Sequence, residues 1–220
     1  MMLRMFVYVS VFFLTVFILR EFVAFRHFRR FKYLLTPLVT VSIIFIPVIA
    51  AGESGLNRYN LLIICALILS LVGDTLLMIE ETDLLKYGMV YFLAAHVMYA
   101  AAFASEYTFR GWNLVLLALF VSVAALHFKR LSRTAGRLTI PVAVYVTAIT
   151  VMIFLAVTQL NRGFTAGPLM AASGALLFGV SDYLHSVNNF QRKIENSTVY
   201  TWLFYAPAQF LLAASTLSVF

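Results

Sequence analysis

The sequence predicts an all-α fold, a polytopic transmembrane bundle of eight helices, from three observations. Of the 220 residues, 63% are hydrophobic and only 11% are charged, whereas soluble domains are about 45–50% apolar and about 25% charged. The mean hydropathy is +0.95, and a chain of this size could not bury so much apolar surface in a core of its own. The apolar residues also form continuous runs of the length that crosses a bilayer, roughly 17–25 residues of helix.

Eight such runs are separated by short charged segments. They cover residues 5–19, 33–51, 61–79, 87–105, 112–128, 140–160, 166–186 and 199–219. The first run extends to Ala24 if Arg20 and Glu21 pair or snorkel near the interface. No small-x-small cleavage pattern follows it, so we expect a retained helix and not a signal peptide. Continuous apolar runs also exclude outer-membrane β-strands, whose polarity alternates.

The connections between the runs are short, and none of them is a linker rich in Pro, Gly or Ser. We therefore expect a single transmembrane domain over residues 1–220. The one cysteine, Cys65, has no partner for a disulfide within the chain. The net charge of +7 is spread over short loops, so it reflects membrane topology and predicts no nucleic-acid partner.

Most basic residues fall on one side of this arrangement. Twelve of the sixteen Lys and Arg residues belong to the first, third, fifth and seventh connections, with Arg20 counted in the first, and four to the opposite side. Because basic loops face the cytoplasm, a count of eight helices places both termini outside. A count of seven helices would place basic residues from both groups on the same side of the membrane.

Two aspartates remain inside the predicted helices. Asp74 stands five residues before the end of its helix and Asp182 four residues before the end of its own. Both helices run from outside to inside, so at 1.5 Å per residue each carboxylate lies about 6–8 Å from the cytoplasmic boundary. Ionisable residues within a membrane are costly and usually functional. We therefore expect the two acids to share one site.

Further polar side chains are candidates for the same site because they also lie within apolar helices. They are His96, Tyr99, Tyr145, Tyr205 and Gln209. His96 and Tyr99 are three residues apart and share a helix face. Each of the five could instead bond a neighbouring backbone group or pack two helices together, and the sequence alone leaves both interpretations open.

The segments around the two aspartates resemble each other. When Asp74 is aligned with Asp182, Leu and Val residues match at several positions, and a small residue, Gly73 or Ser181, precedes each acid. This similarity hints at two four-helix repeats of parallel sense. Such repeats would bring the third and seventh helices together across a pseudo-twofold axis along the membrane normal.

The motifs exclude several kinds of chemistry. There is no G-x-S-x-G nucleophile elbow and no G-x-x-x-x-G-K-[ST] phosphate loop. Asp182 and His185 stand three apart, but zinc needs about three protein ligands, so we expect no metal and no cofactor. Two carboxylates in one site of low dielectric constant divide into a protonated acid and an ionised base. That pair can cleave acetals through an oxocarbenium ion, and it would suit an acid-labile ether reached from lipid.

At these residues the sequence resembles the lysoplasmalogenase family of membrane hydrolases, the YhhN-like proteins. The resemblance covers most of the chain and rests on five motifs in order: Gly73-Asp74-x-Leu76-Leu77, Gly88-x-x-x-Phe92-x-x-Ala95-His96-x-x-Tyr99, Pro141-x-x-x-Tyr145, Gly174-Ala175-x-Leu177-Phe178-x-x-Ser181-Asp182 and Tyr205-Ala206-x-Ala208-Gln209. One departure is Thr36-Pro37, where the family pattern often has Lys-Pro.

The resemblance implies an integral, multi-pass enzyme of a bacterial inner membrane that hydrolyses the vinyl-ether bond of lysoplasmalogens. Its substrate is a lysophospholipid, and its products are a fatty aldehyde and a glycerophospho-headgroup. Asp74 and Asp182 would be the catalytic pair, in either order. The residues that would orient the substrate, the water or the acids are His96, Tyr99, Tyr145, Ser181, Tyr205 and Gln209. Alternative functions are a small proton-coupled transporter and a non-catalytic lipid-binding bundle.

Overall fold

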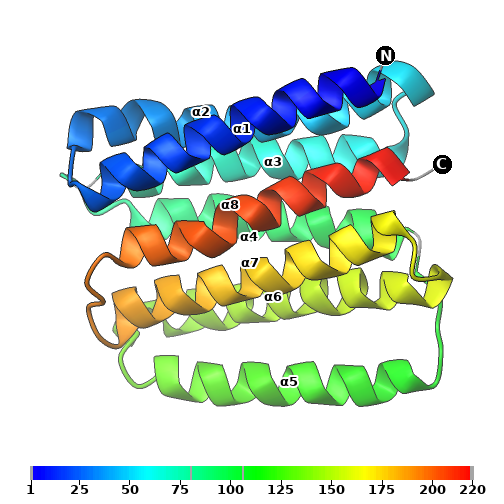
Figure 1. The fold of residues 1–220 in the computed structure, drawn as a ribbon. Coiled ribbons are helices and arrows are strands. Elements are labelled where there is room, and N and C mark those ends of the chain that lie inside the picture. Colours follow the sequence, from blue (N-terminus) through cyan, green and yellow to red (C-terminus); the bar gives the residue numbers. More distant parts are fainter. Residues whose placement is uncertain (1, 80, 106, 219–220) are drawn as a thin grey trace.

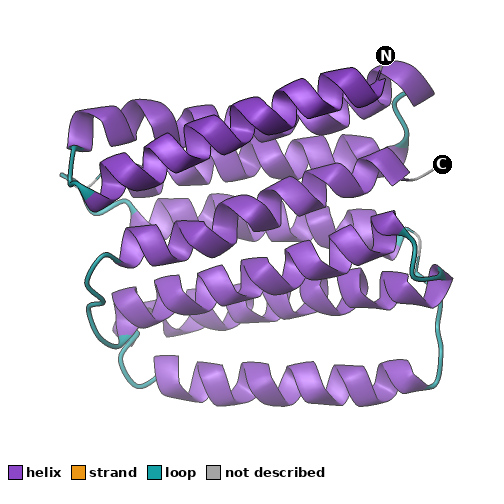
Figure 2. Cartoon of the chain, in the orientation of Figure 1, coloured by secondary structure: helices purple, strands orange, loops and turns teal. Residues whose placement is uncertain are grey.

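Eight α-helices make up nearly all of the computed structural model, which describes residues 2–79, 81–105 and 107–218. They are α1 (Met2–Phe25), α2 (Arg29–Ser54), α3 (Arg58–Met78), α4 (Leu85–Ala104), α5 (Trp112–Leu131), α6 (Thr139–Thr158), α7 (Ala166–Phe190) and α8 (Ser197–Ala214). Single 3₁₀ turns cover Gly136–Leu138, Gln159–Arg162 and Ser215–Ser218. The described part of the chain contains helices and loops but no strand (Figure 2).

The helices lie side by side with their axes nearly aligned (Figure 1). The connections α1–α2, α3–α4, α5–α6 and α7–α8 all lie at the left end of the bundle in that view. We call this the basic end, because it carries most of the Lys and Arg residues. Both ends of the described chain lie at the opposite end, as an even number of helices requires. The predicted all-α bundle of eight helices is confirmed.

The helix boundaries lie within about six residues of the predicted ones, and two of the differences concern residues near the site. α1 continues past Arg20 and Glu21 to Phe25, so Arg20 belongs to a helix and not to a loop. α7 ends at Phe190 and not at residue 186, which places Asp182 eight residues before the helix end, not four. The extra turn of α7 forms because Val187 is buried and the Asn189 amide donates to the His185 carbonyl at 2.8 Å. The predicted end of the eighth run, Val219, lies outside the described residues.

Six of the described helices, α1 to α6, are long and apolar enough to cross a membrane. α7 packs against α6 and α8, and α8 packs against α1, α2, α3 and α7. At Gly174, α7 and α8 approach so closely that a Cβ atom there would lie 3.0 Å from the Ala208 carbonyl oxygen. Small residues at such interfaces are the usual means by which membrane helices pack.

The order in which the helices pack is the same in both halves of the chain. α1 packs on α2, α2 on α3 and α3 on α4, and likewise α5 on α6, α6 on α7 and α7 on α8. Across the halves, α4 packs on α6 and α8 packs on α2. This is the pattern of neighbours expected from two four-helix repeats. The fourth helix of each half lies between the third helix of its own half and the second helix of the other half. The expected packing of α3 directly on α7 does not form in the described part of the chain, because α4 and α8 make the contacts between the halves.

Candidate functional site

One large cavity, with a volume of about 730 Å³, receives side chains from all eight helices. Asp74 of α3 and Asp182 of α7 both line it. The remaining wall is largely apolar on the side of α5 and α6 and polar toward the basic end. The two acids, which are 108 residues apart in the sequence, therefore face the same space.

Asp74 is held by hydroxyl groups from two other helices. Thr40 of α2 donates a hydrogen bond to its Oδ2 at 2.6 Å, and Tyr205 of α8 donates to the same oxygen at 3.0 Å. Arg20 of α1 also interacts electrostatically with this carboxylate. Donors and a nearby positive charge stabilise the anionic form of a carboxylate.

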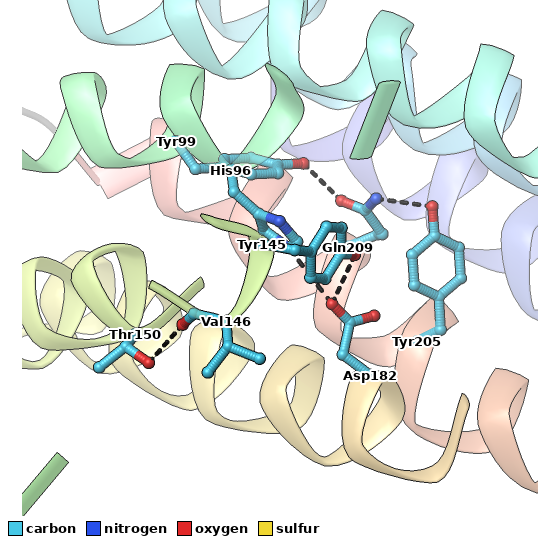
Figure 3. A network of polar contacts seen from close by, with 8 residues as sticks. All are labelled: His96, Tyr99, Tyr145, Val146, Thr150, Asp182, Tyr205 and Gln209. Atoms are coloured by element: carbon cyan, nitrogen blue, oxygen red, sulfur yellow. Dashed lines mark hydrogen bonds and ion pairs between the residues drawn. The ribbon is translucent and has the colours of Figure 1, made fainter. Parts of the chain in front are cut away.

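Asp182 has a different set of partners. Tyr145 of α6 donates a hydrogen bond to its Oδ2 at 2.8 Å, and Nε2 of His96 on α4 lies 3.6 Å from the same oxygen. The side chain of Asp182 is 18% exposed, whereas that of His96 is fully buried. The carboxylate thus opens to the cavity, and the imidazole lies behind it (Figure 3).

A chain of hydrogen bonds passes through the bundle behind the cavity wall (Figure 3). The Tyr99 hydroxyl donates to Oε1 of Gln209. The Gln209 amide donates to the Tyr205 hydroxyl at 2.8 Å, which in turn donates to Asp74. Tyr99 and Gln209 are fully buried and do not line the cavity. They hold Tyr205 in place and do not themselves face the cavity.

The partners of the two acids follow the internal repeat. Each carboxylate accepts a hydrogen bond from the second helix of its own half: Thr40 on α2 for Asp74, and Tyr145 on α6 for Asp182. Each also meets a side chain of the fourth helix of the other half, Tyr205 for Asp74 and His96 for Asp182. The repeat therefore extends to the positions of the polar side chains.

Two hydroxyl groups on the cavity wall have no hydrogen-bond partner among the described residues. They belong to Thr36 and Ser181, which are 2% and 1% exposed. A buried hydroxyl without a partner is costly, and a ligand or a water molecule in the cavity could satisfy both. Of the sequence-predicted residues, the cavity thus brings together Asp74, Asp182, Tyr145, Ser181 and Tyr205.

Sequence reasoning missed two side chains at the site, Thr40 and Arg20. Thr40 continues a polar stripe along α2 with Lys32 and Thr36, since the three are spaced four residues apart, and that spacing was a signal for a helix face inside the bundle. Arg20 is 1% exposed, lies 4.1 Å from the centre of the Trp202 ring, and pairs with Glu21 at 2.6 Å. The neighbouring Glu21 indicated that Arg20 could belong to the helix, but nothing in the sequence indicated that Arg20 meets Trp202 and Asp74.

The charges around the cavity favour an anionic ligand. Four cationic residues line it: Arg20, Lys32, Arg130 and Lys193. The two aspartates are its acidic residues among those described. No three His, Cys, Asp or Glu side chains of the described chain lie together as ligands for one metal ion. The arrangement offers two carboxylates for proton transfer and cations for a phosphate group.

The amino-acid sequence is similar to one family model and to several named proteins. The family model described as the YhhN family matches residues 31–216. A human protein named lysoplasmalogenase TMEM86A is 32% identical over 156 residues, which cover 70% of this chain and 64% of the relative. A Mycobacterium bovis protein named lysoplasmalogenase is 30% identical over 189 residues, covering 82% of this chain and 70% of the relative. A membrane protein named YhhN from Escherichia coli is 26% identical over 162 residues, covering 72% and 76%.

The match therefore spans less than two thirds of the length of the human relative. No solved structure matches the chain. α1 lies outside the region that the family model covers.

Proposed function

The chain belongs to the YhhN family of membrane proteins, and on that premise we propose that it is a lysoplasmalogenase. It hydrolyses the vinyl-ether bond of a lysoplasmalogen to a fatty aldehyde and glycerophosphoethanolamine or glycerophosphocholine. The observation that carries the proposal is the single cavity onto which Asp74 and Asp182 both open, with cationic side chains in its wall. The names of the human and mycobacterial relatives support the same activity.

Asp182 is the proton donor in this mechanism, and Asp74 is the carboxylate that stays anionic. Asp74 accepts hydrogen bonds from two hydroxyls and interacts with Arg20, all of which favour a negative charge. Asp182 accepts a hydrogen bond from Tyr145 and lies about one helical turn from Gly179, which faces Ile153 of the apolar wall. It is therefore placed toward the hydrocarbon side of the bond, where the β-carbon of the vinyl ether would lie.

The reaction then has three steps. Asp182 gives its proton to the β-carbon, and the resulting oxocarbenium ion is stabilised by the charge of Asp74. Water adds to the α-carbon and passes a proton to Asp74, which yields a hemiacetal. Asp74 returns that proton to the ether oxygen as the carbon–oxygen bond breaks, and Asp182 takes the hydroxyl proton of the hemiacetal. Aldehyde and alcohol leave, and both carboxyl groups regain their first state.

The remaining residues of the site have positioning roles in this proposal. Tyr145 and His96 hold Asp182, while Thr40 and Tyr205 hold Asp74. The Tyr99–Gln209 pair fixes the Tyr205 hydroxyl.

The hydroxyls of Thr36 and Ser181 face the cavity and lack partners among the described residues. In the proposal they bind the attacking water or the ether oxygen.

Aldehyde release from the purified protein tests the proposal. The protein is given a lysoplasmalogen and, as a matched control, its analogue with a saturated alkyl ether. We expect aldehyde from the first lipid alone, because a saturated ether has no β-carbon that can take up a proton. In D₂O the aldehyde should carry one deuterium on the carbon beside the carbonyl. No aldehyde, or aldehyde without deuterium, would contradict the proposal.

We further propose that the protein lies in a bacterial inner membrane with its basic end in the cytoplasm and both termini outside. The distribution of Lys and Arg supports this orientation. A reporter inserted between Lys129 and Arg137 should respond as cytoplasmic, and a reporter fused at the C-terminus should respond as external. The reverse result would overturn the orientation.

A further inference from the structure

The two halves of the molecule differ in how their first helices pack. α1 fills its inner face with aromatic side chains, and Phe13 stacks on Phe210 of α8 with ring centres 4.8 Å apart. α5 is the counterpart of α1, yet Asn113 and Leu131 are its only residues classed as buried. The two halves therefore differ at α5, which packs on α6 and α7 but also borders the cavity with its inner face.

A continuous stripe of α5 lines that part of the cavity. Phe120, Val123, Ala124 and His127 lie on one helix face at spacings of three and four residues, and all four line the cavity. From residue 120 to residue 127 the stripe rises about 10 Å. An apolar face of a membrane helix meets either lipid or other protein. This face borders the cavity that Asp74 and Asp182 also line.

The wall opposite α5 is apolar as well. Ile149 and Ile153 of α6 and Gly179 of α7 line it. The hydroxyl of Thr150, also on this wall, donates to the Val146 carbonyl at 2.6 Å, so it is already satisfied within its own helix (Figure 3). Gly179 leaves room for Ile153, whose Cδ1 would lie 2.7 Å from a Cβ at that position.

Among the described residues, the polar contacts of α5 with other segments lie near its two ends. Near its start, Asn161 donates to Oδ1 of Asn113 at 3.2 Å. Near the basic end, Nε2 of His127 lies 3.0 Å from the Ser186 hydroxyl of α7. Between these contacts the helix touches the cavity along its apolar stripe. α5 thus forms a wall held at both ends, with an apolar space behind its middle.

We propose that this space, the α5 arm, binds the hydrocarbon chain of a single-chain phospholipid. The identity of that lipid rests on the function proposed above. The arm is apolar and opens onto the acids, and cationic side chains line the cavity beyond them, including Lys32 and Lys193. A lipid with one hydrocarbon chain and one phosphate matches these three parts of the cavity. The chain lies against α5, the reactive bond lies between the acids, and the phosphate meets the cations.

Two substitutions at adjacent positions of α5 test the proposal. Ala124 lines the arm, whereas Ala125 is exposed and does not line the cavity. Ala124→Trp fills the arm, and Ala125→Trp adds the same side chain outside it. The probe is a hexadecyl phosphocholine with a diazirine at the end of its chain, which cannot be hydrolysed. It is activated by light with the protein in phosphatidylcholine nanodiscs, and the labelled residues are mapped by mass spectrometry.

In the unchanged protein we expect labels on the residues that line the arm, namely Phe120 and Ala124 of α5 and Ile149 and Ile153 of α6. Ala124→Trp should lower this labelling by about tenfold or more, the scale on which apolar pockets reject a misfit, and Ala125→Trp should leave it unchanged. Labels confined to exposed residues such as Val121, or equal labelling in both variants, would overturn the proposal.

If Ala124→Trp does not fold, Ala124→Leu against Ala125→Leu makes the same comparison. Labelling needs no turnover, so labelling of the arm without aldehyde release would refute the proposed activity alone.

Discussion

Thr40 and Thr147 carry the same hydroxyl group but use it differently. The Thr40 hydroxyl donates to the carboxylate of Asp74, whereas the Thr147 hydroxyl donates to the backbone of its own helix, α6, and Thr147 does not line the cavity. Replacing either residue with Val keeps the shape and removes the donor. A hydrogen bond to a charged group is worth about 1.5–3 kcal/mol, so Thr40→Val should lower kcat by about tenfold or more. Thr147→Val, measured in the same aldehyde assay, should stay near the unchanged protein, and equal losses would contradict the role of Thr40.

Arg20 combines a structural contact with a contact to the site. It pairs with Glu21, stacks on Trp202 and interacts with Asp74. Arg20→Met leaves Glu21 without its partner, and breaking such a buried pair costs about 3–5 kcal/mol of unfolding free energy. Arg20→Met combined with Glu21→Met should recover most of that stability, because no charge is then left buried.

Turnover separates the two roles of Arg20. The double variant should stay well below the unchanged protein in kcat, since the positive neighbour of Asp74 is gone. Unfolding in mixed micelles and aldehyde release, measured on the same preparations, test both statements. A stable double variant with full turnover would show that Arg20 is structural only.

At the scale of whole helices, the contact of α7 with α8 depends on a glycine. A Cβ at Gly174 would lie 3.0 Å from both the Ala208 carbonyl oxygen and Cγ of Leu212, whereas nothing lies within 4 Å of the same position at Gly52 in α2. Gly174→Ala should therefore lower the unfolding free energy by about 1–3 kcal/mol, as overpacking does. Gly52→Ala should raise it by up to about 1 kcal/mol, because alanine favours a helix. Thermal unfolding of both variants checks the two signs.

The helices themselves could be predicted from the sequence because lipid selects continuous apolar runs, and each of the eight runs became a helix. The extension of α1 past Arg20 was left open by the sequence, and the Arg20–Glu21 pair on which it depended is present. The end of α7 could not be predicted, because it depends on the burial of Val187 against other helices. The intramembrane position of the two aspartates also pointed to the site. The partnership of Thr40 with Asp74 did not follow, because it depends on how α2 packs against α3.

For the molecule as a whole, the internal repeat explains why two acids so far apart in sequence meet. Each half supplies one acid from its third helix, one hydroxyl donor from its second helix and one polar side chain from its fourth helix to the acid of the other half. The cavity forms where the repeat is broken, at α5. The helices that carry the acids run unbroken through the site, unlike the interrupted helices of many transporters.

The central claim is that the acids of the two halves act as one catalytic unit, and turnover of Asp74→Asn, Asp182→Asn and the double variant tests it most directly. Asn keeps the volume of Asp but can neither donate its proton nor carry its charge, so each single variant should lose about 10²–10⁴-fold in kcat. The double variant should be scarcely slower than the slower single variant, because losses within one catalytic unit are not additive. Folded single variants with near-normal aldehyde release, or losses that multiply in the double variant, would contradict it.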